Sequence, residues 1–253
     1  MRFYAVAQNT FRETQRDRVQ WILLLYAIIV IMSAFVLSPL AMGEGYRVTR
    51  DLGLAALSII GVVLIALVGG GLVQKEVERR TIHTILSKPV GRAEFLLGKY
   101  LGLLGMVTSM FLGMLAFLML TLLIMEGRIE MAVLMAGFFT LGELAVLTAI
   151  VVAFSSFVSP VLSGIFTFAV FVFGHFSQDL LDFAEKAPAG VGFIARGIYA
   201  VIPHLHHFDL RSEAAYGVLP TFPQTLIAVV YGAAYLGAVL VVGSAILSRR
   251  EFK

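Results

Sequence analysis

Residues 100–125 read YLGLLGMVTSMFLGMLAFLMLTLLIM, a stretch without a single charged side chain. A helix needs about 20 mostly apolar residues to cross the hydrocarbon core of a bilayer, and this stretch exceeds that length. Five other segments of the chain have the same character. The sequence therefore predicts six transmembrane helices, at residues 21–42, 52–73, 100–125, 131–154, 157–176 and 226–247.

The composition of the whole chain supports a membrane protein. Of its 253 residues, 59% are apolar and 14% are charged, against roughly 45–50% and about 25% in soluble proteins. No segment alternates apolar and polar side chains with the period of a strand, so the predicted fold is an all-α polytopic membrane protein with a single domain. The lack of cysteine excludes disulfide bonds, thiolate catalysis and cysteine-ligated metal centres.

Three regions outside the predicted spans have patterns of their own. Residues 2–18 place apolar side chains such as Phe3, Ala7 and Phe11 at helical spacing, which predicts an elbow helix at the membrane interface. An ordinary solvated helix is the alternative. Residues 74–98 form a charged loop after the second span, and residues 177–224 form an outer segment between spans five and six. The fifth span is the weakest, because Pro160 interrupts its first turn.

The distribution of basic residues predicts the orientation of the chain. With six spans, both termini share one side with the loops after spans two and four, and that side holds thirteen of the 19 Lys and Arg residues. Basic residues favour the cytoplasmic side of a membrane. We therefore expect a multi-pass protein of the cytoplasmic (inner) membrane with both termini in the cytoplasm.

The loop after the second span has the most informative sequence. Residues 75–92 read KEVERRTIHTILSKPVGR, in which Val77, Ile82 and Leu86 recur on one helical face and Pro89 ends the helix. This pattern predicts a short amphipathic helix, joined directly to spans two and three, that can carry force between a cytoplasmic partner and the membrane. A basic loop that serves only to orient the protein is the alternative.

With the residues around it, this loop resembles the coupling-helix region of ABC transporter permeases. The similar stretches are residues 76–81, 86–92 and 94–102, and further agreement occurs at residues 9–18, 154–160, 202–203 and 208–211. The resemblance is collinear over nearly the whole chain. It is strongest to the six-span exporter class, which includes the permease subunit of the copper-processing Nos system.

The resemblance implies a function. Such a permease couples ATP hydrolysis in a separate ATPase subunit to substrate export or to motion of a periplasmic accessory protein. It implies two ATPase copies that bind ATP and Mg²⁺, a second permease chain (most simply identical), and short outer helices that dip back into the membrane. This chain is then neither an enzyme nor a binder of cofactors or nucleic acid, and it lacks the GxxxxGK[ST] phosphate-binding loop. The implied ATPase contacts are Glu76, Arg79, Arg80, Lys88 and Arg92.

Polar residues within the predicted spans are few, which singles out Glu143 near the middle of span four. No Lys or Arg lies in the middle of another span. We therefore expect its carboxyl group to be protonated, hydrogen-bonded to a residue such as Ser109 or Tyr231, or exposed to a wet cavity. Its role is either structural or in the translocation path or dimer seam. Three glycines that end span two provide either close packing or a hinge, namely Gly69, Gly70 and Gly71.

The histidines are weaker candidates. His204, His206 and His207 lie together in the outer segment, but no Cys or Met cluster completes a soft-metal site, so no metal site is predicted. For His175 we expect a single hydrogen bond. Two other functions stay open, an intramembrane enzyme and a secondary transporter, each using Glu143. The chain contains no HExxH or GxSxG motif and no repeated halves, so the ABC permease is the preferred hypothesis.

Overall fold

The computed structural model describes residues 2–15, 19–41, 44–72 and 91–249, and within these ranges every regular element is a helix. The long helices are α3 (Gly45–Gly69), α6 (Arg92–Glu126), α7 (Met131–Ser155) and α12 (Phe222–Arg249). The shorter ones are α1 (Arg2–Gln15), α2 (Val19–Met32), α8 (Pro160–His175), α9 (Ser177–Lys186), α10 (Ala189–Val201) and α11 (Arg211–Ala215). A π-helical segment, η1 (Ser33–Leu37), and two 3-10 segments, η2 (Ser38–Ala41) and η3 (Leu205–Phe208), complete the set.

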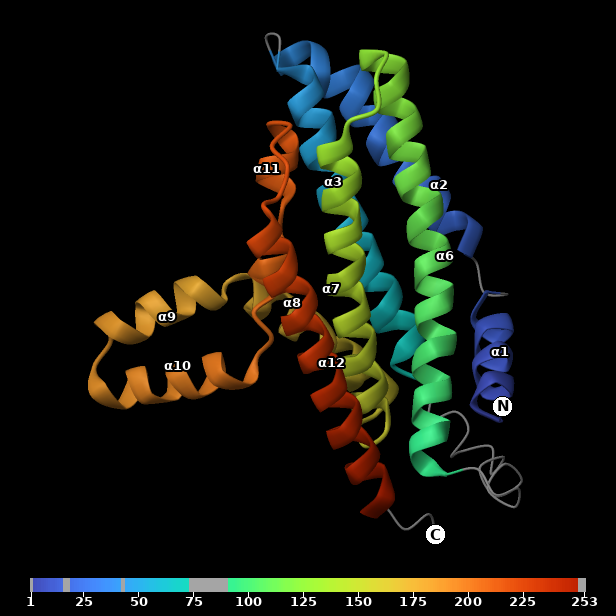
Figure 1. Ribbon diagram of the computed structural model, residues 1–253, viewed down its shortest axis with the longest axis vertical. Coiled ribbons are helices and arrows are strands. Elements are labelled where there is room, and N and C mark those ends of the chain that lie inside the picture. Colours follow the sequence, from blue (N-terminus) through green and yellow to red (C-terminus); the bar gives the residue numbers. More distant parts are fainter. Residues whose placement is uncertain (1, 16–18, 42–43, 73–90, 250–253) are drawn as a thin grey trace.

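The four long helices run side by side along the long axis of the molecule (Figure 1). Helix α7 is central, because it contacts α3, α6, α8 and α12 and is the most buried of the four. Glycines at the helix crossings let the neighbours approach closely. A Cβ atom on Gly61 of α3, for example, would lie only 2.6 Å from the Leu144 side chain of α7. A polar side chain in the middle of α7 is therefore surrounded by protein.

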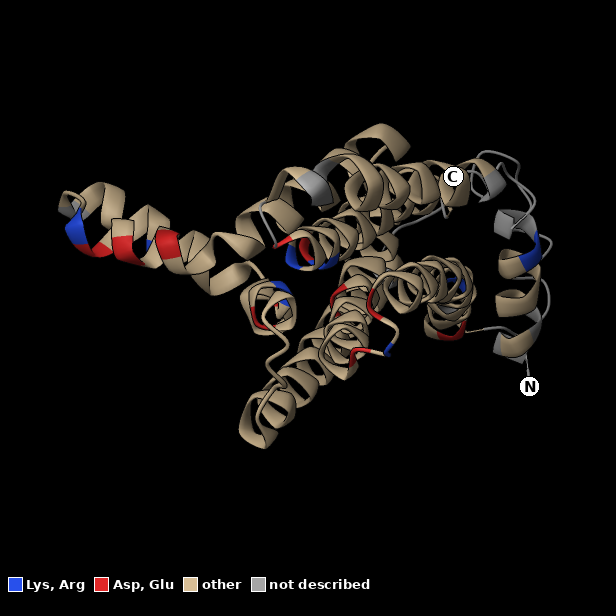
Figure 2. Cartoon of the chain, turned by 90° about the horizontal axis from the view of Figure 1, so that it is seen from above, with Lys and Arg blue, Asp and Glu red and all other residues tan. Residues whose placement is uncertain are grey.

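Helices α3, α6, α7 and α12 are each long and apolar enough to cross a membrane, and the bent pair α8–α9 is a fifth candidate in the described part of the chain. The first predicted span, residues 21–42, contains a shorter apolar helix over Trp21–Val36. The six-span layout therefore stays a prediction. Seen along the bundle axis, most of the helical surface carries no charged residue (Figure 2), as contact with lipid requires.

Several helix boundaries differ from the predicted ones. Helix α3 begins at Gly45 instead of residue 52. The predicted start marks only where the apolar run begins, whereas the helix also includes the charged turns before it. Helix α6 begins at Arg92, so residues 92–98 belong to this helix and not to the loop, and Glu94 favours the positive end of its dipole. Helix α8 begins at Pro160, whose fixed φ suits the first position of a helix. The predicted interruption is therefore a helix start.

Two helices of the outer segment stand apart from the bundle. The chain bends by 67° between α8 and α9, and α9 and α10 then pack against each other in a hairpin that projects sideways (Figures 1 and 2). The exposed side of α9 carries Asp179, Asp182 and Glu185, whereas α10 exposes Phe193 and Ile194. We call this hairpin, residues 177–201, the arm. Its dip into the membrane stays a prediction.

Helix α1 packs beside the lower half of α6 in Figure 1. A Cβ atom on Gly102 of α6 would lie 2.6 Å from the carbonyl oxygen of Ala7, so only glycine permits this approach. Gly105 also faces α1, but a Cβ atom there would make ordinary contact with the ring of Phe11, at 3.4 Å. The predicted helix over residues 2–18 is therefore present over residues 2–15, while residues 16–18 lie outside the described residues. Its place at the membrane interface stays a prediction.

Candidate functional site

The predicted ATPase contacts fall mostly outside the described residues. Glu76, Arg79, Arg80 and Lys88 lie within residues 73–90, and Arg92 is the first residue of α6. The structure therefore shows the two helices that flank the coupling loop, α3 and α6. The end of α3 and the start of α6 lie at the same end of the bundle as the last turns of α7 and α12 (Figure 1).

Glu143 is buried at the centre of α7, with an exposed fraction of 2%. The two partners expected for it are wrong, because both hydroxyl groups have other bonds. The Ser109 hydroxyl donates to a main-chain carbonyl of its own helix, and the Tyr231 hydroxyl accepts from a main-chain N–H of the outer segment. Instead, Nε2 of His175 lies 3.8 Å from Oε1 of Glu143. His175 is the last residue of α8, directly before the bend.

An ion pair at the start of α11, between Asp209 and Arg211, acts electrostatically on Glu143. The guanidinium group of Arg211 donates two hydrogen bonds of 2.8 Å to Asp209, and the main-chain N–H of Arg211 donates a third of 3.2 Å. Burial would raise the pKa of Asp209, but these bonds and the positive charge outweigh it and lower that pKa. Asp209 is therefore ionised at neutral pH and paired with Arg211.

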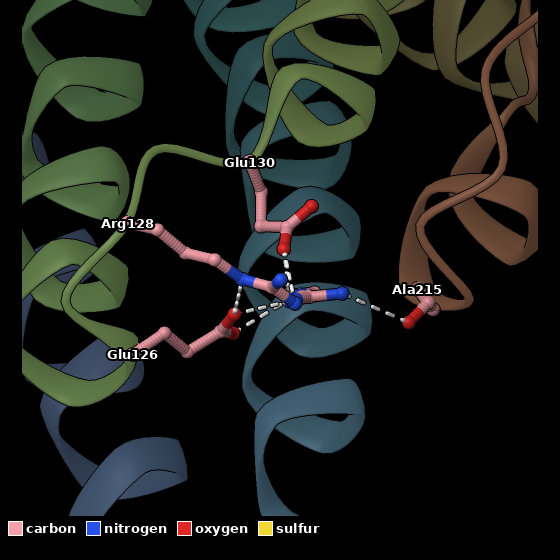
Figure 3. A network of polar contacts seen from close by, with 5 residues as sticks. Glu126, Arg128, Glu130 and Ala215 are labelled. Carbon is pink, nitrogen blue, oxygen red and sulfur yellow. Dashed lines mark hydrogen bonds and ion pairs between the residues drawn. The ribbon is translucent and has the colours of Figure 1, made fainter.

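A cluster of four charged side chains (Figure 3) lies at the end of the bundle opposite to the end of α3 and the start of α6 (Figure 1). This ionic cluster consists of Arg50 of α3, Glu126 at the end of α6, and Arg128 and Glu130 in the following turn. The buried Arg50 donates to both carboxylate oxygens of Glu126, and its Nη2 lies 3.0 Å from Glu130. Bidentate pairs of this kind are strong and directional.

The ionic cluster joins three parts of the chain. Nη1 of Arg50 donates a long bond of 3.5 Å to the carbonyl oxygen of Ala215, which ends α11. Arg50 therefore connects α3 to the α6–α7 turn and to the end of the outer segment. A pocket of about 560 Å³ opens beside it, lined by charged groups of both signs and by Tyr46 and Tyr216. Arg47 lies 4.6 Å from the ring centre of Tyr216, a cation–π contact.

The sequence matches a known family over nearly its whole length. The family model described as ABC-2 family transporter protein aligns with residues 4–251, a range that includes all or most of every helix described above. The chain belongs to the ABC-2 transporter family. It is therefore an ABC transporter permease, and membership of this family implies an ABC ATPase partner in general. A comparison with curated proteins found no match. The narrower likeness to the Nos permease stays a prediction.

The glycines that end α3 of this permease are closely packed. Gly70 has helical dihedral angles, and a Cβ atom there would collide with the carbonyl oxygen of Pro160 at the start of α8. A Cβ atom on Gly69 would lie 2.5 Å from the Val151 side chain of α7. Packing therefore accounts for these two glycines, and a hinge at Gly69, Gly70 and Gly71 stays a prediction.

The outer histidines of the permease stack on one another and on tyrosine rings. The ring centres of His206 and His207 are 4.0 Å apart, and those of His204 and Tyr199 are 4.3 Å apart. Burial and the neighbouring histidines lower the pKa of His206 to about 4, so this ring is neutral at neutral pH. In the described part of the permease, no three His, Cys, Asp or Glu side chains are placed to hold a metal ion.

Sequence reasoning missed the ionic cluster and the contact between Glu143 and His175. A signal for the cluster exists in the turn 126–130, where glutamate and arginine alternate beside an apolar span. Its central residue, Arg50, lies 76 positions away from Glu126, and only the packing of α3 against α6 brings the two together. Nothing in the sequence links His175 to Glu143.

Proposed function

We propose that this permease couples ATP hydrolysis by a separate ATPase subunit to substrate export, or to motion of a periplasmic accessory protein. The observation that carries the proposal is the family match over residues 4–251. That match accounts for the chain as the membrane domain of a transporter. The ATP and Mg²⁺ then bind in the partner, and this chain supplies the coupling loop.

The arrangement of the helices supports a coupling role for Glu76, Arg79, Arg80, Lys88 and Arg92. The loop that carries the first four of these residues joins α3 to α6, Arg92 is the first residue of α6, and both of these helices pack against the central helix α7. A displacement of the loop by a docked ATPase would therefore act on two helices of the core at once. Because cores are closely packed, such a displacement moves helices as rigid bodies.

The proposed assembly contains two permease chains and two ATPase subunits, most simply as a homodimer of permeases in the inner membrane. Its orientation follows from the basic residues, with both termini and the coupling loop in the cytoplasm. The end of the bundle that carries the ionic cluster then faces the periplasm. A periplasmic accessory protein would meet the permease there, beside the pocket of about 560 Å³.

The copy number of the purified complex tests this proposal. The permease is co-expressed with its cognate ATPase, extracted in detergent through a tag on the permease, and weighed intact by native mass spectrometry. We expect two permease chains and two ATPase subunits in each particle. A particle with one permease chain and no second membrane subunit would contradict the assembly, and a permease that never retains an ATPase would contradict the function.

A further inference from the structure

The contact between Glu143 and His175 joins the centre of the bundle to the base of the arm. Glu143 belongs to the most buried helix, and His175 ends α8 immediately before the 67° bend. Oε1 of Glu143 is buried and has no hydrogen-bond partner among the described residues. Nε2 of His175 lies 3.8 Å from this atom. The exposed fractions of the two side chains are 2% and 14%.

The other nitrogen of the His175 ring is also engaged. Its Nδ1 lies 3.1 Å from the carbonyl oxygen of Phe171, one turn earlier in α8. A carbonyl oxygen can only accept a hydrogen bond, so this contact requires a proton on Nδ1. A neutral imidazole carries one proton on its two nitrogens, which leaves Nε2 with a lone pair directed at Glu143.

An extra proton resolves the conflict between the ring and the carboxylate. When Glu143 is ionised and His175 is neutral, only one of the two ring nitrogens carries a proton. The other nitrogen then presents a lone pair to an oxygen that can only accept a hydrogen bond, either the carboxylate of Glu143 or the carbonyl of Phe171. This holds for both tautomers. Two states remove that repulsion: a protonated Glu143 that donates to Nε2, or an imidazolium ring that donates to both oxygens. Both states hold one more proton than the ionised carboxylate and neutral ring together.

The neighbouring elements present charges of both signs to Glu143, since Arg211 attracts the carboxylate and Asp209 repels it. Asp209 and Arg211 act on Glu143 but pair with each other, and on α3 Asp51 acts on Arg211. The Ser58 hydroxyl group of α3 lies close enough to the carboxyl group to act on it as a hydrogen-bond donor. The charged residues of α6 and α12 lie only near the helix ends, and the titratable rings nearby belong to His206, Tyr231 and Tyr235.

We propose that Glu143 and His175 form a one-proton binding site inside the bundle, and that the bound proton holds the end of α8, from which the arm projects, against α7. Ionisable groups at this depth are costly in a membrane protein and are tolerated where they are paired or functional. Removal of the proton at high pH leaves two acceptors facing each other and releases the base of the arm. The site is a property of the permease chain alone and does not require the ATPase.

The proton itself is detected by spectroscopy on the permease in lipid nanodiscs. Infrared difference spectra of wild type and Glu143→Gln report the carbonyl stretch of a protonated buried carboxyl group, and ¹⁵N-histidine NMR reports an imidazolium ring at position 175, assigned with His175→Gln. At neutral pH we expect one of these signals, with the intensity of a single group. The lack of both would overturn the proposal.

The link to the arm is tested with a nitroxide label on Glu185→Cys of α9, since the native chain has no cysteine. We expect the mobility of the label to rise when the pH is raised in wild type. In Glu143→Gln, whose amide donates to Nε2 at every pH, this response should be lost, while the exposed control Glu94→Gln should respond like wild type. An unchanged response in a well-folded Glu143→Gln permease would overturn the link. Because the ATPase is absent, this failure would leave the proposed function unaffected.

Discussion

Replacing Arg50 with methionine removes the central cation of the ionic cluster while keeping a long apolar side chain. In the folded protein the side chains of Arg50 and Glu126 are 7% and 5% exposed, so the substitution leaves Glu126 buried close to Glu130. Removal of one partner from a buried pair costs about 3–5 kcal/mol. Arg128 still lies 2.8 Å from Glu130 and compensates in part, but it is 71% exposed. We therefore expect the free energy of unfolding to fall by an amount at the lower end of this range, about 3 kcal/mol.

The assay is thermal unfolding of the purified permease in detergent, followed by circular dichroism. For a chain of this size a loss of about 3 kcal/mol corresponds to a fall in Tm of roughly 6–12 °C. The matched control is Arg128→Met, which removes an exposed partner of the same carboxylates and should cost less than about 1 kcal/mol. The double variant Arg50→Met/Glu126→Gln should melt above Arg50→Met, because one uncompensated buried charge is gone.

Two results would refute this reasoning. If the Tm of Arg50→Met equals that of the wild type or that of Arg128→Met, the burial of Arg50 adds nothing to the stability of the protein. If the double variant is no more stable than Arg50→Met, the loss does not come from the unpaired carboxylate. Either result would mean that the ionic cluster does not fasten α3 to the α6–α7 turn.

Three further predictions concern packing, topology and pH. Gly102→Ala should displace α1 from α6 and lower the Tm, since its Cβ atom would lie 2.6 Å from a main-chain carbonyl, whereas Gly113→Ala has 3.4 Å of space and should melt like wild type. In intact cells a cysteine at Ser87 should resist a membrane-impermeant thiol reagent and one at Glu185 should react; labelling at Ser87 would reverse the orientation. Because the folded pKa of Asp209 is lowered, its ion pair stabilises at neutral pH and is lost as the pH falls through that pKa. Asp209→Asn should therefore lower the Tm at neutral pH, and its Tm should fall less than that of the wild type as the pH is lowered towards about pH 3. Parallel plots of Tm against pH for the variant and the wild type would contradict this.

The sequence predicted the helices well where apolar runs are long. Residues 100–125 and 131–154 correspond to α6 and α7 because the backbone of a largely apolar run of this length can be satisfied in a bilayer as a helix. The boundaries were less accurate, since helices extend into charged turns that hydropathy treats as loop. Gly45 begins α3 seven positions before the predicted start for this reason.

The polar contacts could not be predicted, because they depend on how helices are rotated against one another. Glu143 was recognisable as an intramembrane carboxyl group, but its neighbour is His175 and not Ser109 or Tyr231. Both of those hydroxyl groups are satisfied by nearby main-chain groups, a choice that sequence spacing does not reveal. Arg50 likewise reads as a residue that only flanks a span, although it is buried at the centre of the ionic cluster.

The most direct test of the central claim is the association of the ATPase with a permease whose coupling loop carries reversed charges. The double variant Arg79→Glu/Arg80→Glu places negative charges where the proposed helix meets the ATPase, and a like-charge contact can cost several kcal/mol. The control is Arg128→Glu, which reverses an exposed arginine at the opposite end of the bundle. At equal permease levels we expect the double variant to lose most of the co-purified ATPase and the control to retain it. Unchanged association and full ATPase activity in the double variant would contradict the coupling role of this loop.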